Sequence, residues 1–182
     1  MAEPFRHAGA RSPEFALLGF LYAQPSHGYT LHQQLVTELG QVWHVSQSQT
    51  YNILKRLEAQ GYLLATTQEQ EKLPPRQVLQ ITDAGRRRFE EWLQTPSGSS
   101  VHAIRLEFIT RLYFAQKLFP DLVPTIIEDQ AADINSALTR LELSRPKIPL
   151  EQTFNRLSLD LRLQQLRAVR EWVIQCRQTL EI

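Results

Sequence analysis

The fold prediction rests mainly on one stretch of sequence, SQSQTYNILKRLEAQGYLL, which runs from Ser46 to Leu64. It has the pattern of a capped helix that ends at Gly61 and is followed by a strand. Ser46 and Gln49 have the spacing of a capping box, and glycine is a common helix stop. At about 100° per residue, one side of this helix gathers the residues expected to pack on neighbouring helices. These residues are Thr50, Ile53, Leu54 and Leu57.

The opposite side of the same helix carries polar residues rather than a mixture of salt-bridging charges. It presents Ser48, Tyr51, Asn52 and Lys55, with Gln49 and Arg56 at its edges. Asparagine can pair with adenine, and lysine with guanine or with phosphate, so this face suits the major groove of DNA. A solvated polar face without a ligand is the alternative that spacing alone leaves open.

The flanking sequence predicts the remaining elements of a winged helix-turn-helix. Two helices precede the quoted stretch, and a β-hairpin and a fourth helix follow it. The predicted ranges are 13–24, 28–40, 62–67, 76–81 and 83–93. Gly40 is expected to end the second helix in the left-handed region of backbone space.

The sequence predicts a mainly α protein with a small β-wing, divided into three parts. Residues 1–11 form a flexible, weakly basic arm, and residues 12–94 form the winged helix, a DNA-binding domain. The run Pro96-Ser-Gly-Ser-Ser100 breaks the helical periodicity and is the best boundary. Residues 101–182 are expected to form a helical dimerisation domain.

Two apolar patterns in the C-terminal part predict contacts with a second copy of the chain. Residues 127–141 repeat in steps of four and three, as in a coiled coil. The final helix is predicted from about 150 to 180. It has one apolar stripe at Phe154, Leu157 and Leu161 and a second apolar stripe, offset around the helix, further along the sequence. Both apolar sides must pack against other helices to be shielded from water. The candidate dimer-interface residues are Ile127, Ile134, Leu138, Leu141, Leu166, Val169 and Val173.

Composition narrows the possible functions. The chain has 182 residues and a net charge of +1, with nine basic and nine acidic residues up to Leu93. Any DNA contact must therefore come from local placement of Lys and Arg. The single cysteine, Cys176, rules out an intrachain disulfide. Because the sequence shows neither a membrane-spanning apolar run nor a signal peptide, we expect a soluble, cytoplasmic protein.

The sequence also lacks the motifs typical of catalytic, phosphate-binding and metal-binding sites. None of its five histidines has metal-ligand spacing with cysteine or carboxylates. It contains no glycine-rich phosphate loop, nucleophile elbow or His-Glu-x-x-His motif. We therefore predict that the protein is not an enzyme and binds neither a metal nor a cofactor.

The N-terminal part resembles the PadR family of winged-helix transcriptional regulators. Four blocks in matching order and spacing carry the resemblance: Ala16-Leu-Leu-Gly-Phe-Leu21; His27-Gly-Tyr-Thr-Leu31; Tyr51-x-x-Leu-Lys-Arg-Leu-Glu58 with Gly61-Tyr-Leu63; and Ile81-Thr-Asp-Ala-Gly-Arg86 with Trp92. The resemblance implies a homodimer that binds a double-stranded DNA operator, represses transcription and is released by a small-molecule or protein effector.

The resemblance extends to individual positions. It implies that Tyr29 lies near the DNA backbone and that Lys72 and Arg76 flank a wing that contacts phosphate or the minor groove. Trp43 and Trp92 are candidates for an aromatic effector pocket. The rival interpretation is a winged-helix protein-interaction module that binds, or is controlled by, a partner protein.

Overall fold

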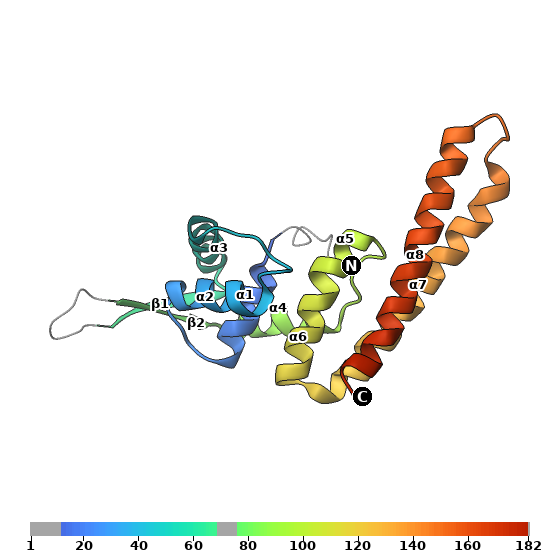
Figure 1. Ribbon diagram of the computed structural model, residues 1–182. Helices are drawn as coiled ribbons and strands as arrows, with labels where there is room; N and C mark the ends of the chain where they lie inside the picture. The colour runs from blue at the N-terminus through green and yellow to red at the C-terminus, as the bar shows by residue number, and fades with distance from the viewer. Residues whose placement is uncertain (1–11, 69–75, 182) are drawn as a thin grey trace. The chain divides into compact units, whose positions relative to one another are not determined.

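The computed structural model describes residues 12–68 and 76–181, and the described chain separates into two compact units. The division lies between Thr95 and Pro96. The described residues are mostly helical, with one small antiparallel sheet (Figure 1). This confirms the predicted fold class, a mainly α chain with a β-wing. The predicted N-terminal arm, residues 1–11, lies outside the described residues.

The N-terminal unit has the element order of a winged helix-turn-helix. Its helices are α1 (Glu14–Ala23), α2 (Gly28–Leu39), α3 (Gln47–Ala59) and α4 (Asp83–Gln94), and its strands are β1 (Leu63–Gln68) and β2 (Arg76–Ile81). Leucine and phenylalanine side chains from all four helices form one core. The fully buried members include Leu17, Leu31, Leu57 and Phe89.

The wing is an antiparallel hairpin whose register pairs Leu63 with Ile81 and Thr66 with Val78. Ser26 exchanges two backbone hydrogen bonds with Leu79, at 3.0 and 2.9 Å, and so adds a one-residue third strand. Because Ser26 stands two residues before α2, this pairing fixes the start of α2 against the wing.

The prediction for Gly40 is wrong, and the structure gives another reason for glycine there. Gly40 has right-handed helical angles, φ −64° and ψ −22°. A Cβ atom at this position would lie 2.3 Å from the carbonyl oxygen of Val36. Among the glycines that the structure describes, Gly61 at the end of α3 has the left-handed φ, +77°. Close backbone approach, rather than helix capping, explains Gly40.

The regular elements described in the C-terminal unit are all helical. A π-helical turn, η1 (Ile104–Phe108), joins α5 (Val101–Ala103) to α6 (Ile109–Leu118). The 3₁₀ turn η2 (Pro120–Leu122) leads into α7 (Val123–Ser144), and η3 (Arg145–Lys147) precedes α8 (Thr153–Thr179). The long helices α7 and α8 run side by side as a helical hairpin (Figure 1).

The hairpin contains all of the predicted dimer-interface residues. Most of their side chains are buried within one chain, where α7 and α8 pack together, and the dimer role of the set stays a prediction. Ile127, Ile134, Leu138, Leu166 and Val173 are at most 7% exposed, and Leu141 and Val169 are half-buried. The stripe at Phe154, Leu157 and Leu161 remains uncovered, at 85%, 58% and 55% exposed.

Candidate DNA-binding surface

Helix α3 begins with the capping box that the sequence predicts. The backbone N–H of Gln49 donates to Ser46 Oγ at 3.2 Å, and the backbone N–H of Ser46 donates to Gln49 Oε1 at 2.8 Å. These bonds satisfy two groups that a helix start otherwise leaves unpaired. The buried face is also as predicted, with Thr50, Ile53, Leu54 and Leu57 all below 9% exposure. Helix α3 is therefore fixed in place by its cap and by its apolar side.

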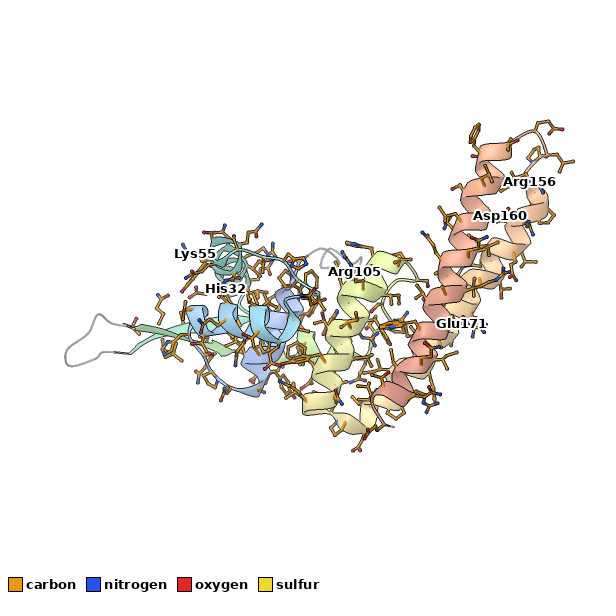
Figure 2. All side chains as sticks on the ribbon, in the orientation of Figure 1. His32, Lys55, Arg105, Arg156, Asp160 and Glu171 are labelled. Carbon is orange, nitrogen blue, oxygen red and sulfur yellow. The ribbon has the colours of Figure 1, made fainter. Side chains whose placement is uncertain are left out.

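The predicted contact residues lie on the opposite, exposed face of α3. Ser48, Asn52 and Lys55 are exposed, and Tyr51 is 39% exposed. Figure 2 shows Lys55 on α3 among the outward side chains of this helix. The structure thus brings four hydrogen-bonding side chains onto one surface. We call Ser48, Tyr51, Asn52 and Lys55 the α3 polar face.

The two edge residues of this helix are engaged within the chain. Gln49 uses its side-chain oxygen in the cap, which leaves its amide nitrogen as the remaining donor. Arg56 donates from Nη2 to Ser12 Oγ at 3.1 Å and to Glu14 Oε2 at 2.9 Å. Arg56 therefore links α3 to α1 within the chain, and its predicted contact with DNA stays a prediction.

Glu14 is the centre of a charge cluster that the sequence did not reveal. Its side chain is 8% exposed and accepts from Arg56 and, at 2.6 Å, from Arg88 of α4. Burial alone would lower the pKa of Arg88, but its hydrogen bonds to Tyr62 and Glu14 outweigh burial and raise that pKa above its ordinary value. Glu14 thus ties α3 and α4 to α1 through partly desolvated ion pairs.

A groove of about 710 Å³ runs beside the α3 polar face, between α2, α3 and β2. Tyr51 and Lys55 of α3 line it, together with Tyr29 at the start of α2. Tyr29 is 52% exposed, and its hydroxyl accepts a 2.6 Å hydrogen bond from Gln33 Nε2. The groove therefore joins the predicted contact residue of α2 to those of α3.

The predicted wing contacts are only partly described. Arg76 opens β2 and pairs with Gln68 across the hairpin. For Arg76 the structure describes the backbone alone. Lys72 lies outside the described residues. Both stay predictions.

The predicted effector residues, Trp43 and Trp92, both lie in the N-terminal unit. Trp43 is 7% exposed. Trp92 stacks on Phe15, with ring centroids 4.6 Å apart and planes within 3° of parallel. It also makes a tilted contact with Phe89 at 5.8 Å. Trp92 therefore belongs to an aromatic cluster that joins α1 and α4, and its effector role stays a prediction.

Residues 12–68 and 76–181 contain no group of three or more His, Cys, Asp and Glu side chains arranged to hold a metal ion. Over the same ranges, no helix is both long enough and apolar enough to cross a membrane.

Comparison with known proteins finds a family match in the N-terminal part of the chain. Residues 17–91 match the model of the "Transcriptional regulator PadR-like family". The negative transcriptional regulator PadR of Bacillus subtilis is 28% identical over 137 residues, which cover 74% of this chain and 74% of that protein. Rv1176c of Mycobacterium tuberculosis, named a probable transcriptional regulator, is 32% identical over 81 residues, or 44% of this chain and 43% of its own length.

Solved structures of similar proteins include two complexes of Bacillus subtilis PadR. The complex with operator DNA has a TM-score of 0.45 and 24% identity, and the complex with p-coumaric acid has a TM-score of 0.40 and 23% identity. Each match covers 93% of this chain and 99% of the other. The PadR-like regulator BC1756 of Bacillus cereus has a TM-score of 0.44 and 23% identity, and the match covers 99% of both chains.

Proposed function

Since residues 17–91 match the PadR-like family of transcriptional regulators, which are not enzymes, we propose that this chain belongs to that family and is a sequence-specific DNA-binding repressor. It acts as a homodimer in the cytoplasm and leaves its operator when an effector binds. Residues 12–94 are its DNA-binding domain and residues 101–182 its dimerisation domain. The observation that carries the proposal is the α3 polar face, exposed on a helix whose cap and buried side hold it rigidly.

The chemistry of the α3 polar face suits base-edge recognition. Asn52 offers a donor and an acceptor that match the major-groove edge of adenine, and Lys55 offers a charged donor to guanine or phosphate. Tyr51 and Ser48 add hydroxyls that can donate or accept. Tyr29 adds an exposed hydroxyl across the groove from α3. Contacts with phosphate fix the position of the protein on the duplex, and contacts with base edges determine which DNA sequence is bound.

The dimer is expected to present two α3 helices to successive major grooves. This requires the two helices to stand about 34–36 Å apart, one turn of B-DNA. An operator with two inverted half-sites would then match the two-fold symmetry of the dimer.

The exposed stripe of α8 supports the choice of a second copy as partner. Phe154, Leu157 and Leu161 lie on one side of α8, and at about 100° per residue Ala168 and Trp172 continue the same side. Ala168 is exposed, and Trp172 is 41% exposed, with its ring in T-shaped contact with Phe108 of the same chain at 6.1 Å between ring centroids. This stripe, residues 154–172, lies opposite the face of α8 that α7 covers. Two copies of α8 laid antiparallel would bury the stripe of each on the other.

Charges beside the stripe favour the same pairing. If the two-fold axis passes near residues 163 and 164, Asp160 of one copy stands opposite Arg167 of the second copy, and the pair occurs twice by symmetry. Asp160 lies on α8 between Arg156 and Glu171, nearer to Arg156 (Figure 2). Within one chain it pairs with Arg145 at 3.2 Å, and Arg167 pairs with Glu142 at 2.7 Å, both half in solvent. Charges at such flanking positions set partner and orientation in coiled coils.

The effector is proposed to act near Trp43 and Trp92. A phenolic acid is the first probe, because the Bacillus subtilis relative has been crystallised with p-coumaric acid. Titration of the protein–DNA complex with p-coumaric acid and related phenolic acids should change tryptophan fluorescence and release DNA with the same midpoint. Trp43→Phe and Trp92→Phe variants identify which indole reports binding. If fluorescence and DNA affinity both stay constant across the series, the phenolic-acid effector is wrong.

Salt dependence tests the DNA-binding function against the protein-interaction alternative. The probe is a DNA fragment recovered by genome-wide selection with the purified protein. A protein that neutralises six to ten phosphates loses roughly 10³–10⁵ in affinity between about 50 and 200 mM salt. We expect a steep fall of this kind, with a fragment of shuffled sequence bound far more weakly. Failure to recover any enriched fragment, or an affinity that salt leaves unchanged, would refute the repressor proposal.

A further inference from the structure

Gly28, the first residue of α2, lies against the aromatic ring of Tyr51. A Cβ atom at position 28 would lie 2.7 Å from Cε1, 3.1 Å from Cζ and 3.3 Å from Oη of Tyr51. Carbon atoms pack best at about 3.5–4.0 Å, so the ring occupies the space of any larger side chain at position 28. The tyrosine of the α3 polar face is therefore in direct contact with the main chain of α2.

The backbone of Gly28 does not itself call for glycine. Gly28 lies at the first position of a right-handed helix, and among the described glycines the left-handed φ belongs to Gly61. Alanine favours a helix more than glycine does. The close contact with Tyr51 is thus the feature of Gly28 that an alanine would disturb.

The other tight glycines of the N-terminal unit differ from Gly28 in what they touch. A Cβ atom at Gly40 or Gly85 would meet a backbone carbonyl oxygen at 2.3 Å, so the main chain would have to move. At Gly28 the obstacle is the far end of a side chain that is 39% exposed. That ring can swing away into solvent. Alanine at position 28 should therefore leave the fold intact and displace the Tyr51 ring.

We propose that Gly28 is a positioning residue for DNA recognition: by carrying no side chain, it seats the Tyr51 ring against α2 and fixes the direction of the phenol hydroxyl. This inference rests on the proposed function of α3. The seated ring forms one wall of the groove between α2, α3 and β2, beside Tyr29 and Lys55. A displaced ring would carry its hydroxyl away from the position used in the complex and would also intrude on the approach of DNA to α3.

A double-mutant cycle tests the proposal. The affinities of the wild type, Gly28→Ala, Tyr51→Ala and the double variant are measured by fluorescence anisotropy with the selected DNA fragment. We expect about a tenfold loss in each single variant, as for one good recognition contact. The double variant should bind like Tyr51→Ala alone, because without the ring an alanine at position 28 obstructs nothing. Gly98→Ala, whose Cβ would meet only the Cβ of Ala103 at an ordinary 3.7 Å, is the matched control.

Two further measurements separate positioning from a general loss of fold. The thermal midpoint of Gly28→Ala should equal that of the wild type within a few degrees. With ¹³Cε-labelled tyrosine, the Tyr51 signal, identified by its absence in Tyr51→Ala, should shift in Gly28→Ala and stay in place in Gly98→Ala. An unshifted signal, or an equal loss of affinity with and without Tyr51, overturns the positioning role. If no fragment binds the wild type, the proposed function fails, and the signal alone decides whether Gly28 seats the ring.

Discussion

Leu157→Glu combined with Leu161→Glu converts the dimer into a folded monomer. Each Leu or Phe side chain that moves from water into an apolar interface contributes about 1.5–3 kcal/mol, and the stripe supplies three such side chains from each chain. Association itself costs about 4–15 kcal/mol, so the stripe is needed to offset it. The double substitution would place four carboxylates in the seam, where burial without partners is strongly unfavourable. Analytical ultracentrifugation measures the mass directly.

The loss of the dimer should also weaken DNA binding by two orders of magnitude or more, since a monomer holds one half-site. The matched control is Ile174→Glu. Ile174 is 47% exposed on α8 and lies about 200° around the helix from Phe154, off the stripe. The Ile174→Glu variant should remain dimeric. Both substituted stripe positions are exposed in one chain, so the helical content should not change. A double variant that still sediments as a dimer shows that another surface joins the two copies.

Lys55→Ala lowers DNA affinity and flattens its salt dependence, whereas Arg56→Ala lowers stability and leaves the salt slope unchanged. The two cations are adjacent in sequence and alike in charge, but the structure gives them different surroundings. Lys55 is exposed on the α3 polar face, and Arg56 is bound to Glu14 and Ser12. Loss of one phosphate contact reduces the slope of log K against log salt concentration by roughly one unit.

The two variants are compared by measuring their DNA affinity at several salt concentrations and their thermal midpoints. Tyr51→Ala extends it: we expect an affinity loss of about 5- to 100-fold with nearly constant salt slope, because the lost contact carries no charge. For Arg56→Ala we expect a loss of about 1 kcal/mol in unfolding free energy, since half of the Arg56 side chain is in solvent. If both Lys55→Ala and Tyr51→Ala bind with wild-type affinity, α3 is not the recognition helix.

The sequence alone determined the elements of the N-terminal unit and the exposed face of α3. A capping box, an apolar period and a glycine stop act within a few residues, so local spacing is sufficient to predict them. The box at Ser46 and the buried side of α3 were both confirmed. The exposure of Tyr51, Asn52 and Lys55 follows directly from which side is buried.

Only the tertiary structure decided which chemically similar groups have partners within the chain. The sequence predicts that both apolar stripes of α8 are buried against other helices. In the structure α7 buries the stripe that contains Leu166 and Val173. Arg56 is paired because Glu14, 42 positions earlier, stands beside it, and Gly28 is needed because α3 brings Tyr51 onto α2. Such contacts join residues distant in sequence, and they depend on how helices pack rather than on any local pattern.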